Sequence, residues 1–358
     1  MIQRSDCSST ANVKNTPGTR QSLVAGHTEG VVVAHMPLKK HAIVALPLAG
    51  RDGDLPPFPL RRQRWLARSQ VSNARGEILS QVLSILALPT PKEGFGALRL
   101  WGQTGAPPDG WVAAADPVFL EARLNHVVLH RLDEASVDDA EVASLFAHLR
   151  QHLAENGDEG FSSIGKLGYV HRRHPMEVAQ ASPAVAEGNH PEDFLPTGDR
   201  SKTHARLQSE VQMCLHESVV NQRRAVAGKP PVTGLWMWGG GVAPALPKVP
   251  LPPLFADEPL CRGYWHASSA AVADWAGDLE ACLASSPDGF VAVLPASAAD
   301  NGNAIDAHLE SLRRMLRRGR LRAVTLLPGR GFRLDIRRWD ALRLWRRKFT
   351  LPGEEHGG

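Results

Sequence analysis

Side chains that could bind or transfer a charged group gather in one stretch of the sequence, residues 203–241. The first part of this stretch, 203–227, has the pattern of one long helix with polar faces, and the Gly-Lys-Pro-Pro of 228–231 would end it. Gln212 and His216 are four residues apart on that helix, so they share one face. We therefore treat both as candidates for ligand binding.

A second face of the same predicted helix carries Glu217, Asn221 and Arg224, at spacings of four and seven residues. The amide and the guanidinium could hold an anionic or carbonyl group in a cleft, and a solvated helix surface is the alternative. His216 beside Glu217 does not form a metal site, because a ligand pair on a helix needs a spacing such as His-x-x-x-His. We expect no metal ion here, and no catalytic nucleophile is identifiable.

Three glycines, Gly239, Gly240 and Gly241, follow a short apolar strand predicted at 235–238. A loop that cradles phosphate needs a helix directly after it, and the prolines at 244 and 247 exclude one. The glycines would instead let the backbone pass close to a ligand or to a neighbouring strand. Both interpretations stay open.

Asp116 is a further candidate, because it follows a strand predicted at 111–115. In open α/β sheets, ligands bind at the carboxyl ends of the strands, so a carboxylate at that position could contact a ligand. An ordinary Asp-Pro turn with Pro117 is the alternative interpretation.

Helices and strands alternate along the chain, most clearly in its last third. This order predicts an α/β fold, in which helices flank a layered, mostly parallel central sheet. The predicted strands are 41–48, 97–101, 111–115, 126–132, 167–171, 290–294, 321–327 and 332–336. The main predicted helices are 77–88, 138–153, 203–227, 268–283 and 304–318, and 244–259 is too rich in proline for regular structure.

The composition of the chain suggests where the folded part lies. Residues 1–40 are rich in Ser, Thr, Asn and Gly, and we expect them to form a disordered extension. Residues 41–350 are expected to form a single α/β domain, with room for a small inserted subdomain around 155–200, and 351–358 a flexible tail. No apolar run is long enough to cross a bilayer. Four scattered cysteines without a CxxC pair favour free thiols in a cytoplasmic protein.

The net charge of +4 is distributed unevenly. The segment Arg313–Lys348 holds 14 Arg and Lys residues against Asp335 and Asp340, a net +12, so the rest of the chain sums to −8. Such a segment could bind an anionic polymer such as nucleic acid, but a solvated surface is the preferred interpretation. Nucleic acid is therefore not the expected partner, and the sequence identifies no protein partner.

The central stretch also carries a resemblance to known proteins. Residues 221–241 read Asn-Gln-Arg-Arg-Ala-Val-Ala-Gly-Lys-Pro-Pro-Val-Thr-Gly-Leu-Trp-Met-Trp-Gly-Gly-Gly, and Pro-Ala-Leu-Pro follows at 244–247. With the motifs at 114–120, 210–216 and 337–347, this segment resembles a family of bacterial proteins labelled RpfE-type regulatory proteins. The resemblance covers about residues 41–350 and implies a regulatory role.

The same segment is more distantly similar to the archaeal-type cofactor-independent phosphoglycerate mutases of the alkaline phosphatase superfamily. That similarity implies an α/β core and an ancestry in two-metal phosphoryl transfer. The active-site motifs of those mutases do not carry over: Asp52-Gly53 is a faint match to the first metal motif, no serine nucleophile follows it suitably, and the chain has no Asp-His pair.

These observations together predict a protein related to phosphoglycerate mutases that has lost metal-dependent catalysis and binds a small phosphorylated or carboxylated molecule. The first alternative is an active phosphomutase or phosphatase with an atypical site, which would need Mn²⁺ or Mg²⁺ as its cofactor. The second alternative is a binder of anionic polymers through Arg313–Lys348.

Overall fold

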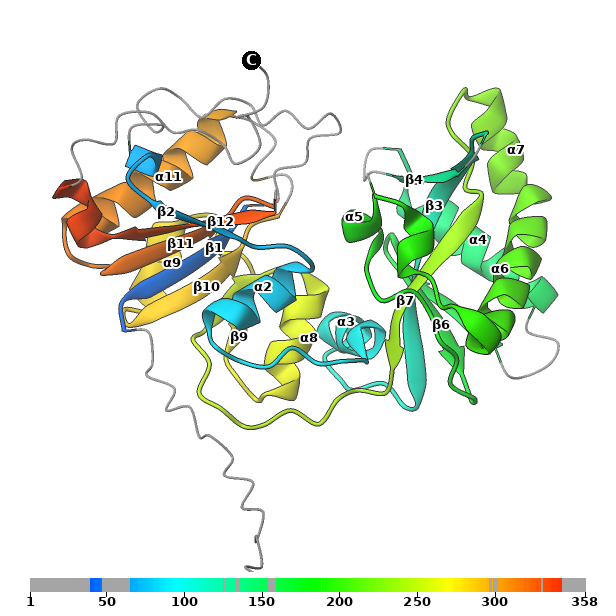
Figure 1. Cartoon of the computed structure of the whole chain (residues 1–358), viewed down its shortest axis with the longest axis horizontal. Coiled ribbons are helices and arrows are strands. Elements are labelled where there is room, and N and C mark those ends of the chain that lie inside the picture. Colours follow the sequence, from blue (N-terminus) through cyan, green and yellow to red (C-terminus); the bar gives the residue numbers. More distant parts are fainter. Residues whose placement is uncertain are drawn as a thin grey trace, which may run out of the picture. The chain divides into compact units, whose positions relative to one another are not determined.

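The computed structural model describes most of the chain beyond its first 38 residues (Figure 1). The described residues are 39–46, 65–124, 126–132, 136–153, 159–187, 189–295, 298, 302–329 and 331–342. The expected extension at 1–40, the tail at 351–358 and the Asp52-Gly53 motif lie largely or wholly outside them.

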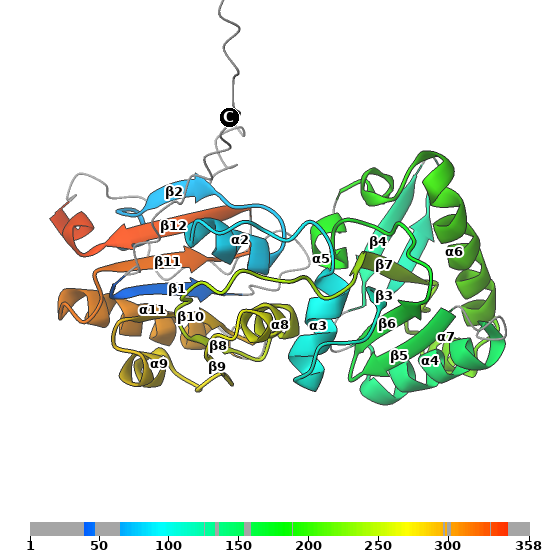
Figure 2. The same ribbon diagram turned by 90° about the horizontal axis from the view of Figure 1, so that it is seen from below.

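A seven-stranded sheet forms one layer of the fold, with the strand order β2-β12-β11-β1-β10-β8-β9. Figure 2 shows β2, β12, β11 and β1 side by side. Strand β1 is parallel to both β10 and β11, and β8 is parallel to both β10 and β9; β12 pairs antiparallel with β11 and with β2. The prediction of an α/β fold with a mostly parallel sheet flanked by helices is therefore confirmed. The strands are β1 (His41–Ala45), β2 (Gln70–Asn73), β8 (Leu254–Ala256), β9 (Val272–Ala273), β10 (Gly289–Val293), β11 (Ala323–Leu327) and β12 (Phe332–Arg337). Strand β8 lies within 244–259, so the prediction that this segment lacks regular structure is wrong there.

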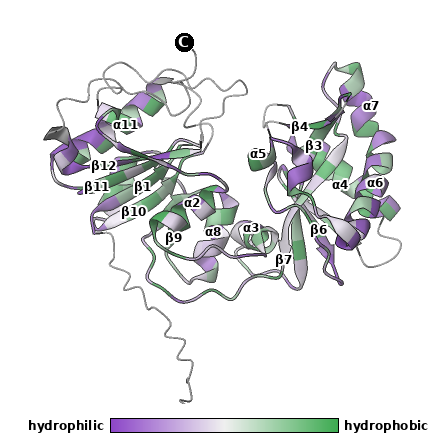
Figure 3. Cartoon of the chain, viewed as in Figure 1, coloured by the Kyte–Doolittle hydropathy of each residue, from purple (hydrophilic) through white to green (hydrophobic). Residues whose placement is uncertain are grey.

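Helices cover both faces of this sheet. Successive side chains of each strand point to opposite faces, so one strand contributes to two cores. Ala42 and Val44 of β1 pack in a core with helices α9 (Leu279–Ser285) and α11 (Gly302–Arg317). Ile43 and Ala45 pack in a second core with α2 (Ile78–Ile85), α3 (Phe95–Thr104) and α8 (Pro259–Ala267). Figure 3 shows the hydrophobic colour along β1 and β10, as expected for strands buried on both faces.

A second sheet, with five strands, comes from the part of the chain between α3 and β8. The pairings between its named strands are antiparallel: β3 pairs with β4, β6 and β7, and β5 pairs with β6. One face packs on helices α4, α6 and α7, whose apolar residues share a core with β3 and β7. The elements are β3 (Trp111–Ala122), β4 (Val127–Arg131), α4 (Asp139–Leu153), β5 (Glu159–Ile164), β6 (Leu167–Arg172), α6 (Ser201–His216), α7 (Val219–Val226) and β7 (Gly234–Gly241).

Short helical turns complete the described structure: α5 (Pro183–Ala186), η2 (Pro191–Phe194), η3 (Gly198–Arg200) and η4 (Arg338–Leu342). Within the described ranges, no helix has both the length and the apolar character that a bilayer crossing requires.

Helix α3 replaces the strand predicted at 97–101, and that prediction is wrong. The segment is a short apolar run, and its periodicity alone cannot distinguish a buried strand from a buried helix. Gly94 before the helix and Gly105 after it both adopt left-handed backbone conformations, with φ of 83° and 77°. Gly105 is the residue that ends the helix, as is common for glycine.

The prediction of one helix at 268–283 is also wrong. Ser268 lies at the end of α8 and is not an N-cap, and Ser269 has a left-handed φ of 56° that stops the helix. Helix α9 begins only at Leu279, where the Asp278 side chain caps it by accepting a hydrogen bond from the Ala281 N–H at 2.8 Å.

The single helix predicted at 203–227 is two helices, α6 and α7, separated at Glu217 and Ser218. Ser218 is extended, with φ of −66° and ψ of 138°, and its hydroxyl accepts a hydrogen bond from the Asn221 N–H at 3.2 Å. An N-cap serine inside the segment therefore starts a new helix. Glu217 consequently does not share a continuous helix face with Asn221 and Arg224.

Helices α3 and α8 cross at a pair of glycines, Gly102 and Gly263. A Cβ atom on Gly102 would lie 1.8 Å from the Pro259 carbonyl oxygen, and one on Gly263 would lie 1.7 Å from the Leu98 carbonyl oxygen. Each helix thus brings its backbone against the other, and neither position has space for a side chain.

Candidate functional site

Asp116 forms a buried ion pair with Arg99 of α3. The Arg99 Nη1 atom lies 2.7 and 2.9 Å from the two carboxylate oxygens, and its Nη2 donates to the Gly168 carbonyl at 2.7 Å. The indole N–H of Trp238 donates to the same carboxylate at 2.7 Å. Only 5% of the Arg99 side chain and 16% of the Asp116 side chain are exposed. Both carboxylate oxygens are therefore occupied by donors from the protein.

The position of Asp116 differs from the sequence prediction, because β3 continues through Pro117 to Ala122 and Asp116 lies in mid-strand. Strand β6 pairs with residues 111–114 of β3 and β4 pairs with residues 118–122, so neither pairs with 115–117. A proline, which lacks the N–H, can be accommodated at such an interruption of the ladder. The Asp-Pro turn is therefore wrong, and Asp116 is not at the carboxyl end of its strand.

Aromatic rings enclose the Arg99 guanidinium. Its central carbon lies 4.9 Å from the ring centre of Tyr169 and 5.4 Å from that of Trp238, within the range of cation–π attraction. Burial raises the pKa of Tyr169 to about 12, so its hydroxyl stays protonated, and it donates to the Gln103 side chain. The phenol serves as a hydrogen-bond donor and is unsuited to proton transfer near neutral pH.

Two more carboxylates interact electrostatically with this group of residues: Glu77 with Asp116, and Glu258 with Tyr169 and Glu77. Burial raises the pKa of Glu77, and the charges of Glu258 and Asp116 raise it further. The Glu77 carboxylate accepts the Ser182 N–H at 2.9 Å, and Glu258 caps α8 by accepting two backbone N–H groups. A carboxylate with a raised pKa is characteristic of functional sites, and Glu77 is not among the candidates that the sequence indicated.

Cys261, the thiol nearest to these carboxylates, is not an activated nucleophile. It is fully buried, and burial together with the charge of Glu258 raises its pKa well above the ordinary value. Nucleophilic cysteines instead have lowered pKa values and partial exposure.

Asn221 and Arg224, which the sequence suggested as ligand contacts, are buried and bonded to the protein. Asn221 accepts the Val232 N–H and donates to the carbonyls of Leu215 and Val232, each at 2.8 Å. These bonds join the end of α6 to the segment that leads into β7. The side chain of Arg224 has 0% exposure and donates to the Pro230 and Ser136 carbonyls and to Glu141 of α4, at 2.8, 2.8 and 2.9 Å.

Gln212, His216 and Glu217 are exposed at the C-terminal end of α6. Gln212 and His216 share a helix face, as predicted, because α6 runs without interruption from Ser201 to His216. Glu217 follows as the C-cap residue. Burial raises the pKa of the Cys214 thiol, and the charge of Glu217 raises it further. Their assignment to a ligand stays a prediction.

The three glycines belong to β7 and do not form a loop after it. A Cβ atom on Gly239 would lie 2.7 Å from the Phe95 Cβ, one on Gly240 2.3 Å from the Trp111 ring, and one on Gly241 2.5 Å from the Gly94 N. The close approach is thus to the start of α3 and to Trp111 of β3. Of the two interpretations, the observed contacts correspond to approach by a neighbouring segment of the chain.

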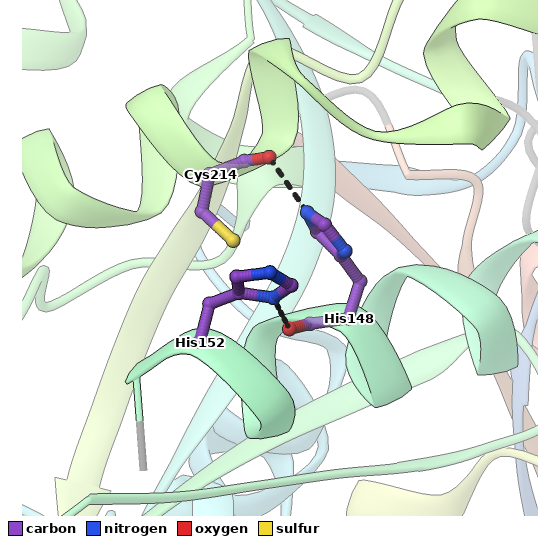
Figure 4. A group of neighbouring side chains, drawn as sticks. All are labelled: His148, His152 and Cys214. Carbon is purple, nitrogen blue, oxygen red and sulfur yellow. Dashed lines mark hydrogen bonds between the residues drawn. The ribbon is translucent and has the colours of Figure 1, made fainter. Parts of the chain in front are cut away.

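Within the described residues, one group of three side chains could hold a metal ion: His148 and His152 of α4 with Cys214 of α6 (Figure 4). Their candidate ligand atoms all lie within 4.8 Å of one another. The histidines have the His-x-x-x-His spacing within the helix predicted at 138–153, which was the signal by which they could have been found. The cysteine is distant in sequence, and no local pattern indicates it.

No protein-family profile matches the chain. A local similarity links it to the 2,3-bisphosphoglycerate-independent phosphoglycerate mutase of Methanothrix thermoacetophila, with 36% identity over 56 residues. That match spans 16% of this chain and only 14% of the mutase.

Two solved structures resemble the chain over most of its length. The cofactor-independent phosphoglycerate mutase from Thermoplasma acidophilum has 18% identity and a TM-score of 0.36, over 83% of this chain and 89% of the mutase. The PH0037 protein from Pyrococcus horikoshii has 15% identity and a TM-score of 0.46, over 84% and 88%. At these TM-scores and identities the backbones correspond only loosely.

Proposed function

We propose that this chain is a phosphoglycerate-mutase-related protein that binds a small phosphorylated or carboxylated molecule without metal-dependent phosphoryl transfer. The relationship is supported by the 36% identity over 56 residues to the Methanothrix thermoacetophila mutase. The resemblance to RpfE-type regulatory proteins supports a regulatory role. The cysteines Cys214, Cys261 and Cys282 are free thiols, which supports the cytoplasmic location that we propose.

The proposed loss of catalysis rests on the hydrogen bonds that occupy both carboxylate oxygens of Asp116. Two-metal phosphoryl transfer needs several carboxylates and histidines that converge on ions about 4 Å apart. Asp116 accepts hydrogen bonds from Arg99 and Trp238 on both oxygens, so the carboxylate has little capacity left to bind a metal ion or to act as a base. A buried partner with a permanent positive charge also repels a cation from this position.

For the ligand contact we propose Gln212 and His216. Their side chains are exposed on α6, whereas Asn221 and Arg224 are buried and hydrogen-bonded to backbone carbonyls of the protein. An amide and an imidazole can both donate hydrogen bonds to a phosphate or carboxylate group. Arg223 and Lys229, which follow in the sequence, are exposed and positively charged.

Binding and turnover of 3-phosphoglycerate by the full chain test this proposal. Calorimetry should detect binding, and Gln212→Ala and His216→Ala should each weaken it about tenfold, the loss expected for one good hydrogen bond to a charged group. Gln222→Ala is the matched control, because Gln222 is an exposed glutamine on α7. No conversion of 3-phosphoglycerate or of a generic phosphate ester should occur, with or without Mn²⁺.

The first alternative, an active phosphomutase or phosphatase, is separated by the same assay. Asp52 follows β1 in the chain and lies outside the described residues. Mn²⁺-dependent turnover that disappears in Asp52→Asn would establish that alternative and end the proposal of lost catalysis. If neither 3-phosphoglycerate nor a simple carboxylate binds to the full chain, the proposed ligand class is contradicted.

The second alternative, binding of anionic polymers, is not favoured by the described part of the basic segment. Arg313 pairs with Glu310, Arg333 pairs with Asp335, and Arg314 and Arg320 both pair with Glu280. These carboxylates offset part of the positive charge that a nucleic acid would neutralise. A steeply salt-dependent shift of DNA or RNA would support this alternative over the proposal.

A further inference from the structure

Helices α4 and α6 bring His148, His152 and Cys214 together on the layer that covers the five-stranded sheet. The two imidazole rings extend from one helix, and the thiol points toward them from the other (Figure 4). The ring centres of the histidines are 4.2 Å apart. The proposed ligand contacts use none of these three side chains.

The hydrogen bonds of the two histidines determine which ring nitrogen is free. His148 Nε2 lies 3.1 Å from the Cys214 carbonyl oxygen, and His152 Nδ1 lies 2.8 Å from the His148 carbonyl oxygen. A carbonyl oxygen can only accept, so each of these nitrogens carries the hydrogen. In the neutral imidazoles, His148 Nδ1 and His152 Nε2 are then left with lone pairs that can bind a metal ion.

This arrangement matches the way in which metal-binding histidines are usually held. A histidine ligand generally donates its other ring N–H to a carbonyl or a carboxylate, which fixes the orientation of the ring. Here the backbone carbonyl of Cys214, itself a candidate ligand, orients His148. The His148 ring is therefore held by the protein before any ion arrives.

The donor set indicates which ion the site would take. Two imidazole nitrogens and a thiolate sulfur suit Zn²⁺, whereas Mg²⁺, Mn²⁺ and Ca²⁺ prefer oxygen ligands. We propose that His148, His152 and Cys214 form a zinc site that links α4 to α6. Three protein ligands leave the fourth tetrahedral position for water or another small ligand.

Zinc geometry requires an adjustment of these side chains. Bond lengths of about 2.0–2.3 Å imply ligand atoms roughly 3.3–3.7 Å apart in a tetrahedral site. One nitrogen of either kind from each histidine ring and the thiol sulfur lie within 4.8 Å of one another, so the ligand atoms must draw closer by about 1 Å. The His148 ring must also turn if it binds through Nδ1, because Figure 4 shows its hydrogen-bonded nitrogen on the side of Cys214. His152 is exposed near the end of α4 and can move this far by a rotation of its side chain. A site of this kind is chemically distinct from the two-metal centres of phosphoryl transfer.

Titration of the chelator-treated full chain with Zn²⁺ and with Co²⁺ tests the proposal. We expect one equivalent of Zn²⁺ to bind and to raise the thermal midpoint, because an ion that binds the folded state stabilises it. Bound Co²⁺ should show the absorption of a tetrahedral ion and a sulfur-to-cobalt charge-transfer band. Cys214→Ser should remove that band, and His152→Ala should lower the affinity at least tenfold.

His190→Ala is the control, because His190 is an exposed histidine on another element. It should leave the Zn²⁺ affinity unchanged. Binding that is equally strong in His152→Ala and Cys214→Ser, or Co²⁺ spectra without a sulfur band, would overturn the proposal, as would the lack of any Zn²⁺ binding. Because His152 is exposed, its variant is expected to fold, and far-UV circular dichroism checks this.

Discussion

The seven-stranded sheet and the five-stranded sheet bury their residues in different ways. In the first, β1 contributes only Ala, Ile and Val to the cores on its two faces. In the second, charged groups are enclosed beside the strands, with Arg99 paired to Asp116 on one face and Arg224 paired to Glu141 among the helices on the other. Apolar strands need no particular partner, whereas a buried charge requires one, so the second sheet depends on a few specific contacts.

The largest effect is expected from breaking the Arg99–Asp116 pair. Arg99→Met leaves a carboxylate with little exposure and no counter-charge, which should lower the free energy of unfolding by about 3–5 kcal/mol. Urea unfolding measures this. The double variant Arg99→Met, Asp116→Leu removes both charges and should recover most of the loss. If the single variant costs less than about 1 kcal/mol, the contrast between the two sheets does not hold.

A smaller loss is expected at Arg224. Arg224→Met removes the donors to the Pro230 and Ser136 carbonyls and to Glu141, and should cost about 2–3 kcal/mol. Arg223→Met is the matched control, because Arg223 is next to Arg224 in sequence and its side chain is exposed. This variant should change the free energy of unfolding by less than about 0.5 kcal/mol. Equal unfolding midpoints for the two variants would show that this pair does not stabilise the helical layer.

The seven-stranded sheet has its own polar feature, which predicts a pH dependence. His41 of β1 donates to the Thr325 hydroxyl at 2.9 Å, and Thr325 donates to Asp335 at 2.6 Å. Burial lowers the pKa of His41 from 6.5 to about 4, which outweighs the raising effect of Asp335. The unfolded chain therefore binds the proton more readily than the folded chain.

The stability from neutral His41 is fully present above pH 6.5 and is lost as the pH falls toward about 4. The loss should reach about 1 kcal/mol by pH 5.5, because one pKa unit corresponds to about 1.4 kcal/mol. Urea midpoints measured from pH 7 to pH 5 in the wild type and in His41→Gln test this. The variant should show a shallower slope, and identical slopes would exclude His41 as the titrating group.

The smallest effect is expected at the surface of α11. Arg314 pairs with Glu280 while about half of its side chain is exposed, and Arg320 remains to pair with the same carboxylate. Arg314→Ala should change the free energy of unfolding by no more than about 1 kcal/mol, and less at high salt. A larger loss in thermal unfolding would mean that surface charges contribute as much as the buried pairs do.

The parts of the fold that the sequence predicted are those with a clear local pattern. Strand β1 is an uninterrupted apolar run, and α4 has acidic residues in its first turn and apolar residues at helical spacing. Helix α3 was predicted as a strand. It is buried around most of its circumference, so its short apolar run shows no polar face that would indicate a helix. The division into α6 and α7 depends on one capping serine, Ser218, within an otherwise helical pattern.

The candidate site was predicted less well, because its contacts join distant parts of the chain. Asp116 was predicted as a ligand contact, but Arg99 and Trp238, which bond to its carboxylate, lie on elements 17 and 122 residues away in sequence. Asn221 and Arg224 were predicted as ligand contacts or as part of a solvated helix face, and in the structure their hydrogen-bond partners include Val232, Ser136 and Glu141. Side-chain type indicates that a residue matters, whereas its partner is determined by the tertiary fold.

The crossing of α3 and α8 restricts how this protein can change over generations. Every codon for glycine, when one base is changed, still encodes glycine, becomes a stop codon, or encodes a residue that carries a Cβ atom. At Gly102 and Gly263 that atom would fall within 1.8 Å of a carbonyl oxygen of the other helix. Random mutation therefore supplies no harmless replacement at either position. The helix crossing should persist in descendants of this protein even where the surrounding surface has diverged.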